Sequence, residues 1–160
     1  MAKKSGFTLI ELCVVMAIIA VIAAVAVPNL LARRAQRDWT TALSQSVAMM
    51  NKARVVAVKE NTRTTMVFDA NENVFRAFVD NDRDHTYHPE TDRLIGVYDI
   101  PASVSIRKST FPAANLEAGR HYCSYNPHGL PVRAGAIELA GKTGQNGKVI
   151  LAMSGRIRVE

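Results

Sequence analysis

Three aspartates at alternating positions have the spacing of the first ligands in a calcium-binding loop: Asp80, Asp82 and Asp84. Carboxylate oxygens are ligands that calcium prefers, and an EF-hand loop places them at its positions 1, 3 and 5. The sixth position of that loop would be His85 and the twelfth Thr91, where an EF-hand needs glycine and glutamate. The sequence therefore excludes an EF-hand. It leaves two alternatives, a calcium loop of another kind that includes Glu90 or Asp92, and a polar loop without a ligand.

A second set of metal-ligand types consists of His121, Cys123 and His128. His121 and Cys123 are two residues apart, so a strand would place them on one face. A fourth ligand is missing and the spacing matches no common zinc site. The alternative is a surface histidine, a buried thiol and a turn.

Enzyme motifs are absent from the sequence, which contains no G-x-S-x-G, no phosphate-binding glycine loop and no dinucleotide fingerprint. The apolar strand before Asp80 and Asp82 could suggest a phosphohydrolase that forms an aspartyl phosphate. Arg76 interrupts this strand, however, so we expect it to alternate as a half-exposed antiparallel strand, and too little chain remains for a parallel α/β sheet. The sequence therefore assigns no catalytic residue, no metal and no cofactor.

Two arginines close to the C-terminus, Arg156 and Arg158, are candidate contacts to a polyanion. On a strand their guanidinium groups would lie on one face, while Ile157 between them would point into the core. Such a pair can contact successive phosphates of a nucleic acid, and the alternative is an ordinary solvated strand edge. The net charge of +6 permits polyanion binding without requiring it.

Glu11 interrupts an apolar run from Phe7 to Ala32. The part from Leu12 to Ala32 has 21 residues without Asp, Glu, Lys or Arg, and at about 1.5 Å per residue a helix of that length crosses a hydrocarbon layer of about 30 Å. We therefore predict a membrane-spanning helix over residues 7–32. A carboxylate deep inside a bilayer costs about 2.5 to 3.5 kcal/mol even on lenient scales. Glu11 must either reach the headgroups or pair with a cation from another chain.

The segment before this span is a short basic leader that ends in a glycine: Lys3, Lys4, Ser5 and Gly6. A secretory signal peptide would be cut after its apolar region, whereas here the small residue precedes the apolar run. A cut between Gly6 and Phe7 would keep the span and lower the net charge from +6 to +4, because 18 basic and 14 acidic residues would remain. It would also create an α-amine four residues before Glu11, where it could neutralise a carboxylate on an adjacent subunit.

Periodicity predicts the elements that must hold these residues. Residues 7–60 should form one long helix, transmembrane first and amphipathic after Arg33, with a kink at Pro28 because proline lacks the amide that would bond to the carbonyl of Ala24. The apolar stripe of its second half should pack on a sheet, and its members are Trp39, Leu43, Val47, Met50, Ala53 and Ala57.

Residues 61–160 should form an antiparallel β domain of two packed sheets, because apolar residues there recur with a period of two. The predicted strands are Thr62–Phe68, Val74–Val79, Leu94–Asp99, Ser103–Lys108, His121–Tyr125, Ala134–Leu139, Lys148–Met153 and Arg156–Val159. Cys13 lies in the span and Cys123 in the β domain, so the two cysteines should not form a disulfide within one chain.

The N-terminal residues resemble those of type IV pilins and type II secretion pseudopilins: Gly6 followed by Phe-Thr-Leu-Ile-Glu, a long apolar helix, and Pro28. The resemblance implies that a prepilin peptidase cleaves between Gly6 and Phe7, that the Phe7 amine is methylated, and that these helices form the core of a filament. Glu11 would then neutralise the Phe7 amine of a neighbouring subunit.

The whole chain, including the terminal Gly155-Arg-Ile-Arg, resembles the FimT and GspH family of minor pilins and pseudopilins. This resemblance implies a pilin-like α+β fold, a structural role without enzymatic activity, and a place at or near the tip of a type IV pilus or type II secretion pseudopilus. Major pilins often carry a disulfide-closed loop near the C-terminus, so its absence favours a minor subunit. Some FimT proteins bind DNA through G-R-x-R, which would make Arg156 and Arg158 DNA contacts during uptake. The alternative is a secretion pseudopilin H that binds no DNA and acts only in protein export.

The partners and the location follow from the same resemblance. The partners would be other pilin or pseudopilin subunits, the prepilin peptidase and, as an additional alternative, DNA. The protein would cross the bacterial inner membrane once, with its β domain in the periplasm, before it enters the filament. Charge alone does not orient the span, because Lys3 and Lys4 on one side face Arg33, Arg34 and Arg37 on the other.

The N-terminal processing can be tested by intact-mass spectrometry of the protein purified from its native membranes. We expect a chain that lacks residues 1–6 and carries a methyl group on Phe7. A Gly6→Leu variant should keep the leader, because the peptidase would no longer meet a small residue before the cut. Recovery of assembled wild-type protein that still begins at Met1 would contradict the prediction.

Overall fold

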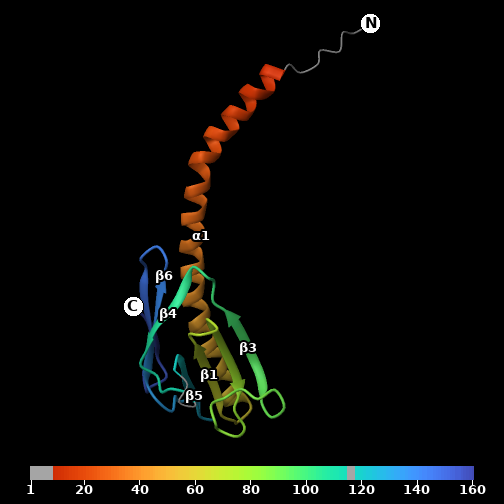
Figure 1. The fold of residues 1–160 in the computed structure, drawn as a ribbon. Helices are drawn as coiled ribbons and strands as arrows, with labels where there is room; N and C mark the ends of the chain where they lie inside the picture. Colours follow the sequence, from red (N-terminus) through yellow and green to blue (C-terminus); the bar gives the residue numbers. More distant parts are fainter. Residues whose placement is uncertain (1–8, 115–117) are drawn as a thin grey trace.

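One helix, α1 (Leu9–Lys59), accounts for 51 residues and would be about 75 Å long at 1.5 Å per residue. The computed structural model describes residues 9–114 and 118–160. The helix runs through Pro28 without a break and curves along its N-terminal half (Figure 1). A local kink at Pro28 stays a prediction.

The two halves of α1 lie in different surroundings. Residues 9–34 are all exposed in the single chain and extend away from the strands (Figure 1). The second half is buried along one side, and the buried residues are Trp39, Ala42, Ser46, Met49, Met50, Ala53 and Ala57. Trp39 and Met50 are therefore core residues, as predicted, whereas Leu43 and Val47 from the predicted stripe are only partly buried. Ala53 and Ala57 are also buried as predicted. At the other two positions the preceding small residues, Ala42 and Ser46, are the fully buried ones.

The helix ends with a left-handed residue, Asn61, whose φ is 50°. The amide of Thr62 donates to the carbonyl of Ala57 at 3.0 Å, and the amide of Asn61 donates to the carbonyl of Val58 at 3.3 Å. This pattern is a Schellman cap, and asparagine is one of the few residues that tolerates its left-handed position. The chain then turns directly into the first strand.

Within the described residues, eight strands form two antiparallel four-stranded sheets around the second half of α1 (Figure 1). The first sheet has the order β3-β2-β1-β5, and its strands are β1 (Thr64–Asp69), β2 (Val74–Val79), β3 (Arg93–Asp99) and β5 (Arg120–Tyr125). The second has the order β4-β6-β7-β8, and its strands are β4 (Val104–Ser109), β6 (Gly135–Gly141), β7 (Asn146–Leu151) and β8 (Ile157–Val159). The predicted α+β, pilin-like fold with a long helix on two antiparallel sheets is confirmed. A division into a leader 1–6, a helix 7–60 and a β domain 61–160 stays a prediction, and the leader lies outside the described residues.

The central strands of the first sheet are buried on both faces, which corrects the expectation of a half-exposed β2. All six residues of β1 are buried, and in β2 only Arg76 is partly exposed. One face packs against α1, where the Thr64 hydroxyl donates to the carbonyl of Ala53 at 3.0 Å. The other face is covered by the loop between β2 and β3, which the alternation of residues in β2 could not reveal.

Two aromatic contacts hold this loop on the sheet. Tyr87 packs against Phe78 of β2 with ring centroids 5.5 Å apart, and His85 stacks on Tyr122 of β5 at 3.8 Å. Arg83 and His85 have φ angles of 64°, so the loop turns through left-handed conformations that side chains other than glycine rarely adopt. The loop is a defined part of the fold.

The second sheet lies close to α1 at Gly147 of β7. A β-carbon built at Gly147 would lie 2.8 Å from Cζ2 of Trp39 and 3.4 Å from Cδ1 of Leu43. These side chains belong to the packed core, so they cannot move aside without cost. Gly147 is therefore required by the approach of the helix to the sheet.

We expect Gly147→Ala to destabilise the protein by about 1 to 3 kcal/mol, because the added methyl group overpacks the contact with Trp39. The measurement is urea unfolding of the full chain in detergent, followed by circular dichroism. Gly96→Ala is the matched control. Its methyl group would meet only Lys52 Nζ at 3.6 Å and Met49 Cε at 4.0 Å, and it should change stability by less than about 0.5 kcal/mol. Equal effects of the two substitutions would contradict the packing argument.

Candidate functional site

The exposed half of α1 carries Glu11 in its first turn. Val14, Ile18 and Ile22 follow at three, seven and eleven positions, a spacing that places them on the same side of the helix as Glu11. They line a shallow apolar groove together with Ala17 and Val21. Gly6 and Phe7 lie outside the described residues, so the structure does not test their role.

This half of the helix is long and apolar enough to cross a membrane. An 18-residue window in α1 has a mean hydropathy of 2.9, and none of that window is buried. Leu9 and Val25 are 81% and 72% exposed in the single chain. Such a surface is stable only against lipid or against apolar side chains of other molecules.

The C-terminal arginines lie at the edge of the second sheet. Arg158 stands in β8, which pairs only with β7 among the described strands, and Arg156 directly precedes it. Both are exposed, whereas Ile157 between them is half-buried against the core, as the alternation predicted. Lys148 on the neighbouring strand lies 4.0 Å from Glu138, so its charge is partly compensated.

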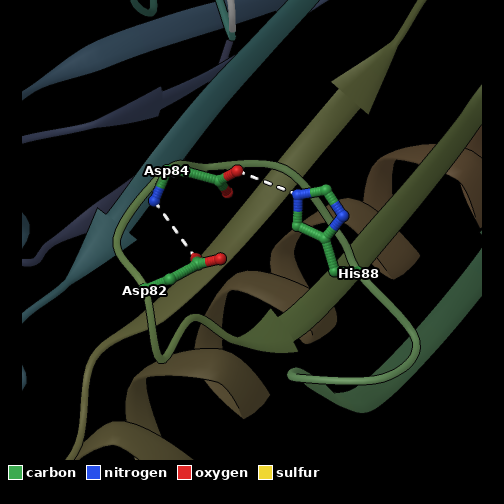
Figure 2. Close-up of side chains that lie close together, drawn as sticks. All are labelled: Asp82, Asp84 and His88. Carbon is green, nitrogen blue, oxygen red and sulfur yellow. Dashed lines mark hydrogen bonds and ion pairs between the residues drawn. The ribbon is translucent and has the colours of Figure 1, made fainter.

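The loop between β2 and β3 brings several acidic side chains together. Carboxylate oxygens of Asp80, Asp82 and Asp92 lie within 4.8 Å of one another, and Asp82 also belongs to a second set with Asp84 and His88. Figure 2 shows the second set, in which His88 Nε2 lies 2.9 Å from Asp84 Oδ2. The sequence had suggested Asp92 as a partner of the alternating aspartates, and the fold places it beside them.

Hydrogen bonds shift the pKa values in the second set. Burial alone would raise the pKa of Asp84, but the amide of Thr86 and the imidazole of His88 stabilise its carboxylate, so the pKa lies below the usual range. The hydrogen bond to Asp84 in turn raises the pKa of His88. Both shifts favour the charged forms, so they favour an ion pair between Asp84 and His88 at the surface of the loop, where water screens it.

His121, Cys123 and His128 do not form a metal site. Within the described residues, neither set of clustered metal-ligand groups includes any of the three. His121 Nδ1 bonds to the carbonyl of Phe111 at 2.9 Å. Cys123 is buried, and burial raises the pKa of its thiol to about 12. The alternative of a buried thiol is thus confirmed, and both cysteines are free.

The structure also contains an ionic cluster that the sequence analysis missed. Arg120 Nε donates to Asp69 Oδ2 at 2.6 Å, and Arg76 lies 3.4 Å from Glu72. Burial would raise the pKa of Asp69, but the amide of Glu72 and the guanidinium of Arg120 outweigh it and hold the pKa below the usual range. Asp69, Arg76 and Arg120 line a cavity of about 220 Å³ together with His85 and Tyr87 of the loop. The pairing of β1 with β5 places Asp69 opposite Arg120, and no local pattern in the sequence indicates that pairing.

Comparisons with known protein families match both parts of the chain. Residues 1–27 match the prokaryotic N-terminal methylation motif. Residues 42–155 match the family described as type II transport protein GspH, which covers more than half of the chain.

Curated relatives match over shorter stretches. The type II secretion system core protein G of Aeromonas hydrophila is 35% identical over 63 residues, which are 39% of this chain and 44% of that protein. The type IV wide pilus major component PilA4 of Thermus thermophilus is 58% identical over 40 residues, which are 25% of this chain and 30% of that protein. The core protein G of Escherichia coli K12 is 45% identical over 49 residues, 31% of this chain and 34% of that protein. The chain thus spans less than half the length of each of these relatives.

A solved structure supports the fold. The minor pseudopilin EpsH from the type 2 secretion system of Vibrio cholerae superposes with a TM-score of 0.57 at 8% sequence identity, over 76% of this chain and 94% of EpsH. The family match over residues 42–155, the methylation motif at the N-terminus and the shared fold lead to one conclusion: the chain belongs to the GspH family of type IV pilin-like proteins, which are structural components and not enzymes.

Proposed function

We propose that this chain is a minor pseudopilin that a prepilin peptidase cleaves between Gly6 and Phe7 and that then joins a type II secretion pseudopilus through α1. The observation that carries the proposal is the exposed apolar half of α1 with Glu11 at its start. The methylation motif and the GspH family match support the processing and the class of filament. A type IV pilus uses the same assembly chemistry and remains the related alternative.

Glu11 has the assembly role in this proposal. Once the chain is cut, the α-amine of Phe7 lies one helical turn before Glu11 in sequence. In a bundle of such helices, the Glu11 carboxylate of one subunit neutralises the Phe7 amine of its neighbour, and a charge pair in lipid is far less costly than either charge alone. The groove of Val14, Ile18 and Ile22 continues from Glu11 along the same side and accepts apolar side chains of the adjoining helix.

The location follows from this role. Before assembly, the apolar half of α1 crosses the inner membrane once and the β domain lies in the periplasm. Because α1 is continuous from the span into the core, extraction of the span would carry the β domain with it into the filament.

A second candidate function is DNA binding by Arg156 and Arg158, as an addition to the structural role. The observation that favours it is the exposed placement of both arginines at the edge of the second sheet, with Ile157 turned toward the core. A strand edge lets both guanidinium groups reach a phosphate backbone. Neither family match nor relative supports DNA binding, so this candidate depends on a direct measurement.

The assembly role is tested with Glu11→Leu. The variant should insert and fold, since the span becomes more apolar, but it should be absent from sheared filaments because the amine of the neighbouring subunit stays unpaired in lipid. Quantitative immunoblots of the membrane and filament fractions measure how much of the variant is present in each. Cys13→Leu is the matched control, because it adds an apolar side chain at nearly the same depth while it keeps the carboxylate. Normal recovery of Glu11→Leu in filaments would falsify the pairing.

DNA binding is tested with the double variant Arg156→Ala/Arg158→Ala of the full chain in detergent. If both arginines neutralise phosphates, the slope of log Kd against log salt for duplex DNA should fall by about 2, since each neutralised phosphate adds about 0.9 to that slope. Fluorescence anisotropy at several salt concentrations measures this slope.

Arg107→Ala/Lys108→Ala is the matched control for the DNA experiment. It removes the same charge from exposed positions on β4, at the opposite edge of the same sheet. An equal decrease of the slope in both double variants would indicate attraction by net charge alone. Unchanged affinity in the Arg156/Arg158 variant would remove the DNA candidate and leave the filament role intact.

A further inference from the structure

The loop between β2 and β3 holds three carboxylates close together beside the first sheet. Oxygen atoms of Asp80, Asp82 and Asp92 lie within 4.8 Å of one another. Asp80 and Asp92 are only 2% and 7% exposed, whereas Asp82 is exposed. Like charges at this separation repel strongly where water does not screen them. The arrangement therefore calls for a positive charge among the three.

Hydrogen-bond donors of the protein satisfy some of the carboxylate oxygens in this set. Asp92 accepts the amide of Asn81 on Oδ1 at 3.2 Å and the amide of His88 on Oδ2 at 3.0 Å. Asp80 Oδ2 accepts the Thr65 hydroxyl at 2.6 Å and lies 3.2 Å from His85 Nδ1. These bonds hold the two buried carboxylates in place.

The second carboxylate oxygen of Asp80 provides a further argument for a bound cation. Asp80 Oδ1 is buried and has no hydrogen-bond partner among the residues that the structure describes. A carboxylate oxygen that has lost its water and gained no donor is rare in folded proteins and needs an explanation. Because Oδ2 is already bonded to Thr65, Oδ1 is the oxygen of this carboxylate that is available to a ligand. A cation would satisfy it and would also offset the repulsion among the three aspartates.

The donor set indicates which cation. All three side chains offer carboxylate oxygens, which are hard ligands that suit calcium or magnesium better than zinc or copper. Calcium accepts six to eight oxygens in an irregular arrangement, whereas magnesium needs a near-ideal octahedron. Asp82 is exposed, so water can complete the coordination from that side. We propose that Asp80, Asp82 and Asp92 bind a calcium ion that fastens the loop between β2 and β3 to the first sheet.

The neighbouring set of Asp82, Asp84 and His88 fits a metal less well (Figure 2). Asp84 Oδ2 is bonded to His88 Nε2 at 2.9 Å, and Asp84 Oδ1 accepts the amide of Thr86 at 2.7 Å. A metal at this position would have to displace the imidazole from the carboxylate. Asp92 in the first set also has both oxygens bonded, as Asp84 has in the second. The first set is nevertheless the better site, because it contains the buried and unbonded Asp80 Oδ1 and the second set contains no such atom among its three residues.

Calcium binding would also hold in place the part of the loop that lines the cavity beside the first sheet. The loop supplies His85, Thr86 and Tyr87 to the wall of that cavity, which Asp69 and Arg120 also line. His85 also bonds to Asp80, so an ion on Asp80 would fix the imidazole that stacks on Tyr122. The ion would thus stabilise the cover of the first sheet, independently of any role of the chain in a filament.

The test uses the full chain in detergent, freed of divalent ions with EDTA and dialysed. Titration with calcium chloride by isothermal titration calorimetry should show one ion per chain with a Kd of about 0.1 to 1 mM, the range of extracellular calcium modules. Calcium should also raise the Tm, and magnesium at equal concentration should raise it less. The absence of calcium-dependent heat and of any Tm shift in the wild type would overturn the proposal.

Asp82→Asn separates binding from folding, because Asp82 is exposed and its replacement relieves repulsion. The Kd for calcium should rise by about tenfold or more, while the Tm without calcium should be equal to or above that of the wild type. Asp99→Asn, an exposed aspartate at the end of β3, is the matched control and should leave the Kd unchanged. Equal weakening in both variants would indicate a general effect of charge and would contradict the site.

His88→Gln distinguishes the two sets of ligands. It removes the imidazole of the second set and should leave calcium binding unchanged, whereas Asp80→Asn should abolish it. If His88→Gln abolished binding while Asp80→Asn did not, the metal would belong to Asp82, Asp84 and His88, and the proposed site would be wrong.

Discussion

The contact between the second half of α1 and the strands supports the rest of the β domain. Ala42, Ala53 and Ala57 are fully buried there, and such small side chains let the strands approach the helix closely. Trp39 reaches the second sheet at Gly147, and the carbonyl of Ala53 accepts the Thr64 hydroxyl from the first sheet. Both sheets are therefore built on one helix, and without it neither would have a covered inner face.

The first half of the same helix has a surface that suits a different environment. Residues 9–34 are exposed in the single chain, and most of their side chains are apolar. This surface requires lipid or other helices, while the second half requires the strands. Because α1 is continuous between the two regions, the position of the β domain is tied to the orientation of the exposed half of the helix. That coupling is a mechanical property that a flexible linker between two domains would not provide.

The outer face of the first sheet shows how polar residues can belong to a core. β1 and β2 are buried on both sides because the loop between β2 and β3 covers them with Tyr87 and His85. The loop carries aspartates, and burying them removes their water. Backbone amides compensate Asp92, and Thr65 compensates one oxygen of Asp80. The buried aspartates of this loop are therefore held by donors from the backbone and from β1.

Local periodicity in the sequence determined the long helix, the strands and the alternation of Arg156, Ile157 and Arg158, because a period of 3.6 or of two reports which side of an element is apolar. The uninterrupted apolar run determined the exposed apolar half of the helix. The β2 prediction, Val74–Val79, matches the observed strand. The family resemblance at Gly6, Phe7 and Glu11 was also available from the sequence alone. Only the tertiary structure decided which strands pair. Asp69 meets Arg120 across 51 residues of sequence, and Asp92 joins Asp80 and Asp82 after the loop folds back. The first contact leaves no local pattern, because it depends on the register between strands far apart in the chain. The second was one of two alternatives that the sequence left open, because only the path of the loop decides whether Glu90 or Asp92 lies beside Asp80 and Asp82.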